Sequence, residues 1–201
     1  MCGIVGYMGH RDASSIVLEG LKKLEYRGYD SAGLALYDGQ KLNVTKTKGK
    51  VATLENKLLT TGNTNSSIGI GHTRWATHGI PSDENSHPHY SNSGELVIIH
   101  NGIIENYDSI RKELIQRGYE FKSETDTEVL VNLIEEIQNK TQLKLGEAVQ
   151  LALKEVVGAY AIAVFDIKKP NELVVAKLGS PLAVGIGKNE YFIGSDASPF
   201  L

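Results

Sequence analysis

The sequence predicts an α+β fold in one layered domain. Short β-branched segments come first, helix-like periodicity occupies the middle of the chain, and further strand-like segments follow. The 201 residues are 41% hydrophobic and 22% charged, a composition typical of a globular protein with a buried core. No linker rich in Ser and Gly, no internal repeat and no low-complexity tract divides them, so we expect a single domain.

The first third of the sequence predicts strands, one hairpin and two helices. The expected strands span residues 2–7, 31–37, 42–47 and 68–72. Asp38–Gly39 stands between the two central strands and is a strong hairpin signal. One helix is expected after Asp12, whose side chain can cap its first turn, and should stop near Arg27–Gly28. A second helix is expected over residues 51–58, where apolar residues share one face.

The rest of the chain predicts a long loop, three helices and a second group of strands. Residues 75–93 are rich in Pro, Ser, Asn, His and Asp and lack periodicity, which is typical of a functional loop or lid. An apolar strand over residues 96–100 is expected to end at Asn101–Gly102. Helices are expected over residues 107–117, 127–137 and 146–156, and strands over residues 159–165, 173–177, 182–186 and 191–193. Short turns between several of these strands predict antiparallel pairing.

Charge, hydropathy and cysteine content argue against several classes of protein. Lys and Arg number 21 against 24 Asp and Glu, and this near-balance argues against a nucleic-acid-binding surface. The longest apolar runs, such as residues 159–165, are far shorter than the ~20 residues that cross a bilayer, so no membrane partner is expected. One cysteine cannot form an intramolecular disulfide, and no secretory signal pattern precedes it. Both observations predict a cytoplasmic protein.

Cys2 is the first candidate for catalysis because of its position. Aminopeptidases remove Met ahead of small residues, which would leave Cys2 with a free α-amine. Such an amine has a reference pKa of ~7.7–8.0 and can act as general base for its own thiol, an established way of activating a nucleophile. The alternative is that Cys2 is a small buried hydrophobic residue in a strand.

Asn101 and Gly102 are the candidate oxyanion donors. Acyl transfer needs donors aimed at the developing negative charge, commonly a backbone N–H together with an Asn or Gln side chain. Asn101 supplies the carboxamide, and Gly102 permits a close backbone approach because it has no Cβ. The alternative is an ordinary strand-to-turn Asn-Gly pair, which is common in turns.

Arg74 and Asp126 are the candidate ligands for a free α-amino acid. A strand over residues 68–72 delivers Arg74 to the head of the long loop, where its guanidinium can hold a carboxylate bidentately. Asp126 can pair with an ammonium group, or alternatively it only caps the next helix. Trp75, beside Arg74, is either a packed core aromatic residue or a movable cover.

The histidines raise the alternative of a metal site. Five of the six lie between His72 and His100, and Cys2 would be a fourth zinc ligand. Their spacings do not match a closed structural zinc site and no cysteine pair accompanies them, so hydrogen-bonded loop histidines are the better interpretation. Nucleotide binding gets no support, because neither a P-loop nor a dinucleotide-binding fingerprint occurs. We therefore expect no metal and no other cofactor.

The order of these motifs along one chain resembles the glutaminase domain of the glucosamine-6-phosphate synthase family. The members of that family, also called glutamine–fructose-6-phosphate aminotransferases, are class II glutamine amidotransferases. The resemblance covers essentially the whole chain and rests on the segments MCGIVG (1–6), LEYRGYDSAG (24–33), RW (74–75), NSHPH (85–89), HNGIIEN (100–106) and SETDT (123–127). It implies an N-terminal-nucleophile hydrolase fold, a four-layer αββα sandwich of two antiparallel sheets.

The resemblance also implies a role for each residue that matches a family motif. It makes Cys2 the nucleophile after removal of Met1, and Asn101 and Gly102 the oxyanion donors. The remaining implied roles are binding of the substrate carboxylate by Arg74, Thr77 and His78, binding of its ammonium by Asp126 with help at Gly102, gating of an ammonia channel by Trp75, and support of the site by Arg27 and His87.

The resemblance finally implies a division of labour within a longer enzyme. Residues 2–201 would form the glutaminase domain, which hydrolyses L-glutamine to glutamate and ammonia, and the full-length enzyme is expected to be a homo-oligomer. The sugar-isomerase domains, which bind fructose 6-phosphate, are absent from this chain. Tyr26, Tyr29 and the Trp75 motif favour this branch over phosphoribosyl amidotransferases and asparagine synthetases. A non-catalytic glutamine-binding regulatory module and the glutaminase domain of another class II amidotransferase are the alternatives.

Overall fold

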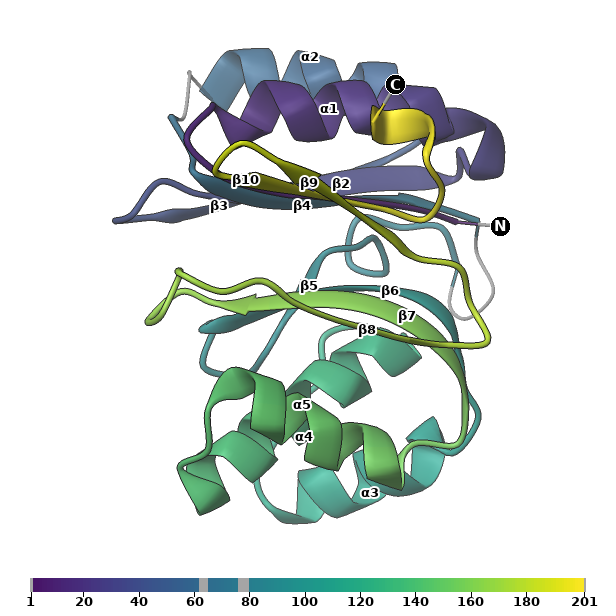
Figure 1. Cartoon of the computed structure of the whole chain (residues 1–201). Coiled ribbons are helices and arrows are strands. Elements are labelled where there is room, and N and C mark those ends of the chain that lie inside the picture. Colours follow the sequence, from purple (N-terminus) through teal and green to yellow (C-terminus); the bar gives the residue numbers. More distant parts are fainter. Residues whose placement is uncertain (1, 62–64, 76–79, 201) are drawn as a thin grey trace.

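The computed structural model describes residues 2–61, 65–75 and 80–200, and these form four layers (Figure 1). Two β-sheets lie face to face, α1 and α2 cover the outer face of one, and α3, α4 and α5 cover the outer face of the other. The helices are α1 (Ala13–Leu24), α2 (Val51–Thr61), α3 (Tyr107–Gln116), α4 (Asp126–Thr141) and α5 (Leu145–Glu155), with short 3-10 turns η1 (Glu25–Arg27) and η2 (Ser198–Phe200). The predicted α+β class and αββα layering are confirmed.

The two sheets are antiparallel throughout. The larger has the strand order β3-β2-β4-β1-β10-β9, and the smaller has the order β5-β6-β7-β8. The strands are β1 (Gly3–Met8), β2 (Ser31–Tyr37), β3 (Leu42–Lys48), β4 (Ile68–Arg74), β5 (His89–Tyr90), β6 (Leu96–Ile104), β7 (Gly158–Asp166), β8 (Val174–Leu178), β9 (Ala183–Gly187) and β10 (Glu190–Gly194). The N-terminal strand β1 lies inside the larger sheet, between β4 and β10, so Cys2, which directly precedes it, is held at one end of the sandwich.

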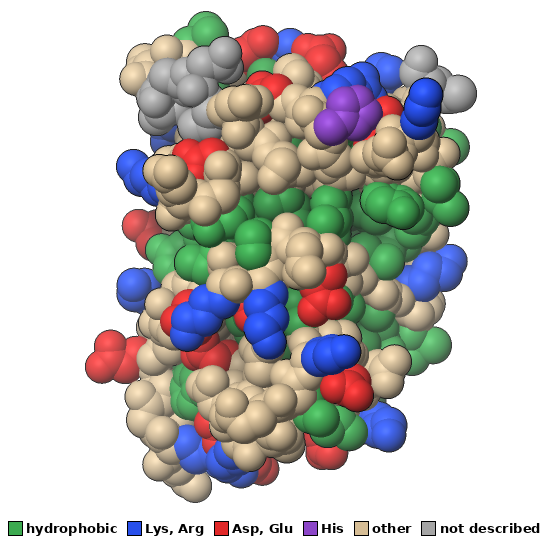
Figure 2. All heavy atoms as spheres, turned by 60° about the vertical axis from the view of Figure 1, so that its left-hand side comes forward, with side chains coloured by type: hydrophobic (Ala, Val, Ile, Leu, Met, Phe, Trp, Pro, Cys, Tyr) green, Lys and Arg blue, Asp and Glu red, His purple; other side chains and the backbone are tan. Residues whose placement is uncertain are grey.

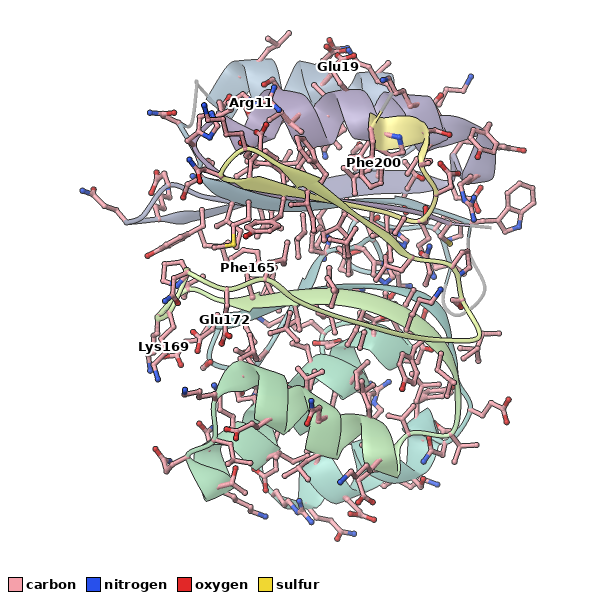
Figure 3. All side chains as sticks on the ribbon, viewed as in Figure 1. Arg11, Glu19, Phe165, Lys169, Glu172 and Phe200 are labelled. Carbon is pink, nitrogen blue, oxygen red and sulfur yellow. The ribbon has the colours of Figure 1, made fainter. Side chains whose placement is uncertain are left out.

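Hydrophobic side chains form three core layers, one between each pair of neighbouring layers of the sandwich. The layer between the sheets contains Ile4, Ile70, Ile99 and Phe165, and Figure 3 shows Phe165 there. The other two layers lie beneath α1 and α2 and beneath the helices of the smaller sheet. Figure 2 shows a band of hydrophobic side chains across the middle of one face, at the level of the layer between the sheets. Burial of this kind is the main force that stabilises a layered domain.

Several predicted element ends are confirmed locally. The Asp12 side chain caps α1 by accepting a hydrogen bond from the Ser14 N–H at 3.3 Å, as expected from the sequence. The first helix gives way to the turn η1 and stops before Gly28.

Within the predicted loop over residues 75–93, the two-residue strand β5 pairs with β6 and brings the segment against the smaller sheet. No helix in the described ranges combines the length and apolar composition that a bilayer crossing requires.

The sequence prediction is wrong about where β6 ends. The strand does not stop at Asn101–Gly102 but continues to Ile104, because its pairing with β7 continues through Gly102↔Tyr160 and Ile104↔Gly158. Gly102 has φ +125°, and a Cβ at this position would lie 2.0 Å from the Ala159 carbonyl oxygen. Only glycine fits this backbone, so Gly102 lets the two strands approach closely instead of ending one of them.

Candidate active site

One pocket gathers most of the residues that the sequence singles out. It encloses about 250 Å³ at the end of the sandwich where the N-terminus lies (Figure 1). Eight of the ten predicted site residues line it, namely Cys2, Arg27, Arg74, Trp75, His87, Asn101, Gly102 and Asp126. The other two, Thr77 and His78, lie outside the described residues. The fold therefore brings together motifs from the N-terminus, β4, β6 and the start of α4.

Cys2 places a partly exposed thiol in this pocket, directly before β1. The Trp75 backbone N–H donates to Sγ over 3.1 Å, and Sγ lies 3.4 Å from the Trp75 carbonyl oxygen, to which the S–H can donate. Burial raises the pKa of the Cys2 thiol, and the Trp75 N–H and the Arg74 charge oppose this only in part. The thiol is therefore protonated at neutral pH and needs a base before it can attack a carbonyl.

The carbonyl oxygen of Cys2 holds the residue in place. It accepts hydrogen bonds from Arg27 Nε at 3.2 Å and from Asn101 Nδ2 at 2.9 Å. Arg27 Nη1 in turn donates to Asp196 Oδ2 at 2.9 Å, and the Tyr26 hydroxyl donates to the same oxygen at 2.6 Å. Arg27, which the sequence offers only as a supporting residue, thus contacts the backbone of Cys2 directly.

Asn101 and Gly102 lie side by side in β6 at the wall of the pocket. The Asn101 side chain is buried, and its Oδ1 accepts a hydrogen bond from His72 Nε2 at 2.9 Å. Its amide nitrogen has two hydrogens, of which one is donated to the Cys2 carbonyl oxygen. A carboxamide N–H and a backbone N–H on adjacent residues can both donate to an oxyanion formed in the pocket.

Arg74 and Asp126 bring opposite charges to the same pocket. Arg74 is the last residue of β4 and its side chain is buried; burial lowers the pKa of its guanidinium, which still remains a cation. Asp126 is the first residue of α4, and its Oδ2 accepts the Ile104 N–H at 2.8 Å. The capping alternative for Asp126 is wrong, because Thr125 is the residue that caps α4.

Trp75 lies at the rim of the pocket and is 47% exposed. Its ring stands edge-on to that of Tyr29, with the ring centroids 5.5 Å apart. The alternative of a packed core aromatic residue is therefore wrong, and the indole is in a position to cover the pocket.

Four histidines form a buried cluster next to the pocket, and two of them, His87 and His100, line it. The rings of His72 and His87 stack with centroids 4.1 Å apart, and His89 stands edge-on to His87. His87 Nε2 and His100 Nδ1 lie 2.9 and 3.0 Å from the Thr127 hydroxyl oxygen. Burial lowers the pKa of His72 to about 3 and takes those of His87 and His89 well below the usual value. These three rings are therefore neutral at physiological pH.

The histidines differ from the sequence interpretation in one respect. The four clustered histidines are hydrogen-bonded, as expected, but all four are buried. His87 lies in the predicted loop, whereas the other three lie in strands β4, β5 and β6. Across residues 2–61, 65–75 and 80–200, no three His, Cys, Asp or Glu side chains are grouped in a way that could hold a metal ion.

The pocket also contains residues that sequence reasoning did not single out. Thr125 and Thr127 come from a segment already noted for Asp126, so its run of hydroxyl residues was the available signal. Ser180 and Pro181 reach the pocket from the connection between β8 and β9. Their sequence carries only an ordinary turn signal, and nothing in it points to a site.

Comparison with known proteins shows what the whole chain is similar to. Relatives named glutamine–fructose-6-phosphate aminotransferase [isomerizing] are 58% identical in Bacteroides thetaiotaomicron and 52% identical in Chlorobaculum tepidum, and each match covers 100% of this chain. The chain spans about a third of the length of these relatives, 33% in both cases.

A solved structure and a domain family complete the comparison. The B. subtilis glutamine phosphoribosylpyrophosphate amidotransferase, solved with ADP and GMP, superposes with a TM-score of 0.84 and 30% identity, over 99% of this chain and 43% of that one. The expected N-terminal-nucleophile hydrolase fold is thereby confirmed. Residues 59–201 match the family described as glutamine amidotransferase domain, and this match covers more than half of the chain. The chain belongs to the glutamine amidotransferase domain family.

Proposed function

We propose that residues 2–201 form a glutaminase domain that hydrolyses the side-chain amide of L-glutamine, with Cys2 as nucleophile after removal of Met1. One observation carries this proposal: the Cys2 thiol, the Asn101 carboxamide, the Arg74 guanidinium and the Asp126 carboxylate line the same pocket of about 250 Å³. A nucleophile, an oxyanion donor and a pair of opposite charges are what hydrolysis of a free amino-acid amide needs. The mechanism uses neither a metal nor an organic cofactor.

Binding of glutamine uses the two charges of the pocket. The guanidinium of Arg74 donates two parallel hydrogen bonds to the α-carboxylate, which Thr77 and His78 also bind, as the family resemblance implies. The Asp126 carboxylate accepts hydrogen bonds from the α-ammonium while its Oδ2 stays anchored on the Ile104 N–H. This orientation directs the side-chain amide of glutamine toward Cys2.

Acylation begins with a proton transfer inside one residue. The α-amine of Cys2 takes the Sγ proton, and the thiolate forms a bond to the side-chain carbonyl carbon of glutamine while the carbonyl π pair moves to oxygen. Asn101 Nδ2 and the Gly102 N–H donate to that oxyanion. When the carbonyl re-forms, the C–N bond breaks and the Cys2 ammonium protonates the leaving nitrogen. Ammonia departs and a γ-glutamyl thioester remains on Sγ.

Deacylation repeats these steps with water. The same amine takes a proton from water, the resulting hydroxide attacks the thioester carbon, and the same donors stabilise the second oxyanion. Its collapse breaks the C–S bond, the ammonium returns the proton to Sγ, and glutamate leaves. The raised pKa of the Cys2 thiol supports this route, because a protonated thiol requires the base that the amine supplies.

The ammonia is the product that a longer enzyme would use. We propose that in such an enzyme, a cytoplasmic homo-oligomer, sugar-isomerase domains outside this chain bind fructose 6-phosphate and convert it with this ammonia to glucosamine 6-phosphate. The names of the relatives and the 33% of their length that this chain covers support this proposal. Trp75, at the exposed rim of the pocket, then gates the route of the ammonia, and Arg27 and His87 support the site.

The test is an intact-mass measurement combined with a turnover assay. We expect the chain to have lost Met1, to take up one equivalent of 6-diazo-5-oxo-L-norleucine on Cys2, and to release glutamate from glutamine. The matched control is Cys2→Ser, in which labelling at residue 2 should disappear. A processed chain that binds glutamine without labelling or turnover would show a binding module and overturn the proposal.

A further inference from the structure

The carboxamide of Asn101 forms a hydrogen bond at each of its two ends. On one side Nδ2 donates to the Cys2 carbonyl oxygen at 2.9 Å, and on the other Oδ1 accepts from His72 Nε2 at 2.9 Å. The same His72 nitrogen lies 3.1 Å from the His100 carbonyl oxygen. His72 does not line the pocket, so it acts on Asn101 from behind the pocket wall.

The partners of His72 fix which ring nitrogen carries the proton. Both neighbours of Nε2 are carbonyl oxygens, which only accept hydrogen bonds, so Nε2 must be the protonated nitrogen. Among the described residues, Nδ1 is buried without a hydrogen-bond partner, which agrees with an unprotonated nitrogen there. Burial lowers the pKa of His72 to about 3, so the ring keeps this neutral form across the physiological range.

The Nε2–H group of His72 selects one of the two orientations of the Asn101 side-chain amide. The two ends of a carboxamide have nearly the same shape but opposite hydrogen-bonding character, so only partners can select one orientation. In the observed orientation an N–H of Nδ2 is available to the pocket, whereas the reversed amide would present a carbonyl oxygen to a developing negative charge. The reversed amide would also place its NH₂ group against the His72 N–H.

We propose that His72 is a positioning residue whose Nε2–H holds the Asn101 carboxamide with its N–H directed at the oxyanion site. The role rests on the proposed hydrolysis of glutamine, and it adds a residue that touches neither substrate nor nucleophile. Its position is firmly set, because β4 pairs on both sides, with Ile4 and Gly33 opposite His72, and the His87 ring stacks on it at 4.1 Å.

The first test compares His72→Phe with His72→Gln. Phenylalanine keeps a ring but has no N–H, whereas the glutamine amide can place an N–H near the position of Nε2. Because loss of a whole oxyanion donor costs ~10²–10³ in kcat, we expect His72→Phe to lower kcat by ~10–100-fold and to change KM for glutamine less than about threefold. His72→Gln should recover part of the lost kcat. Equal kcat losses in both variants would overturn the proposal.

A variant in the core beside His72 tells the loss of Asn101 positioning apart from a general disturbance of strand β4. Ile70 lies two residues before His72 in the same strand, is fully buried and belongs to the layer between the sheets. Ile70→Val removes one buried methylene, which typically costs about 1 kcal/mol of stability. Its kcat should stay within about twofold of the wild type. A kcat loss as large as that of His72→Phe would mean that disturbance of β4 alone explains the effect.

A double-mutant cycle asks whether His72 acts through Asn101. If it does, His72→Phe should have little further effect on kcat in an Asn101→Ala background, because the group that it orients is already gone. A merely structural role would lower kcat by the same factor in both backgrounds, and that additive result would overturn the proposal. Far-ultraviolet circular dichroism and thermal unfolding should show all four proteins folded.

A measurement that does not depend on catalysis tests the role of His72 independently of the proposed function. In an amide ¹H–¹⁵N spectrum of the 201-residue chain, the Asn101 side-chain pair can be assigned by its disappearance in Asn101→Ala. We expect that pair to shift and to lose protection from exchange in His72→Phe, but to change little in Ile70→Val. An unmoved pair overturns the positioning role. Absence of glutamine hydrolysis in the wild type, with the pair shifted as expected, would instead overturn the proposed function alone.

Discussion

Arg27 and Asp196 form an ion pair, with 2.9 Å between Nη1 and Oδ2, although 169 residues separate them in the chain. The same guanidinium donates through Nε to the Cys2 carbonyl oxygen at 3.2 Å. Next to this pair, the Ser195 N–H donates to the Ile4 carbonyl oxygen at 3.0 Å and the Ser195 hydroxyl accepts the Ile4 N–H at 3.1 Å. The segment after β10 therefore fixes the start of β1 and with it the candidate nucleophile.

We expect the Asp196 carboxylate to stabilise the fold above about pH 4. Burial raises its pKa, but hydrogen bonds from Tyr26, Ser198 and Arg27 outweigh this and lower the pKa to about 2. Because the folded pKa lies below that of an unfolded Asp, the contribution is present above the unfolded value and is lost as the pH falls toward 2. It amounts to about 2 kcal/mol at neutral pH, from a shift of nearly two units at 1.36 kcal/mol each.

The measurement is urea unfolding of Asp196→Asn and the wild type at several pH values. The difference in unfolding free energy should be largest at pH 7 and should shrink steadily below pH 4. Glu120→Gln, a change in an exposed loop residue, is the control and should match the wild type throughout. A difference that stays constant down to pH 2 would show that the charge of Asp196 is not the cause.

Gly102→Ala should destabilise the protein far more than Gly94→Ala. Both glycines have positive φ, +125° and +78°, but a Cβ on Gly102 would lie 2.0 Å from the Ala159 carbonyl oxygen, whereas nothing lies within 4 Å of one on Gly94. We expect a loss of about 1 kcal/mol at Gly94 from backbone strain alone, and of roughly 3 kcal/mol or more at Gly102 from strain plus steric overlap. Thermal and urea unfolding measure both; similar losses would contradict the close approach of β6 and β7.

The buried histidines should make the fold sensitive to mild acid. The pKa of His72 is lowered to about 3, and those of His87 and His89 are lowered in the same direction, chiefly by burial. Below about pH 6.5 the unfolded chain binds protons at these positions and the folded chain does not, so stability falls as the pH drops. Each such histidine adds a slope of up to about 1.4 kcal/mol per pH unit well below its unfolded pKa.

Unfolding free energies between pH 7 and pH 5 test this sensitivity. His89→Gln should reduce the slope, since it removes one buried titratable ring. The control is His10→Gln, which changes an exposed histidine and should keep the full slope. Stability that does not change between pH 7 and pH 5 would contradict the neutral buried cluster.

Arg74→Lys should weaken glutamine recognition although it keeps the positive charge. Lysine lacks the planar fork that binds a carboxylate through two parallel hydrogen bonds. We expect kcat/KM for glutamine to fall about tenfold or more, mainly through a higher KM. Arg117→Lys, a partly exposed residue next to α3, is the control, and it should leave steady-state kinetics unchanged. An unchanged kcat/KM in Arg74→Lys would remove Arg74 from the binding site.

The sequence by itself determined the element types and most of the residues of the candidate site. Periodicity, turn residues and the Asp12 cap are local properties, so they predicted the helices α1 to α5, the strands other than β5, and antiparallel pairing for several of these strands. The position of Cys2 and the order of the motifs singled out eight residues that line one pocket. Sequence signals failed where contact with another strand decides the local structure. Asn101–Gly102 has the sequence of a turn, but pairing with β7 keeps it within a continuous strand.

Only the tertiary structure decided which residues support that chemistry. His72 lies 29 positions before the Asn101 amide that it holds, Asp196 lies 169 positions after Arg27, and Ser180 reaches the pocket from the opposite half of the chain. Hydrophobic periodicity shows which face of a strand is buried, but it does not show which partner that face meets. These contacts arise from strand order and register in two packed sheets, and no single stretch of sequence encodes them.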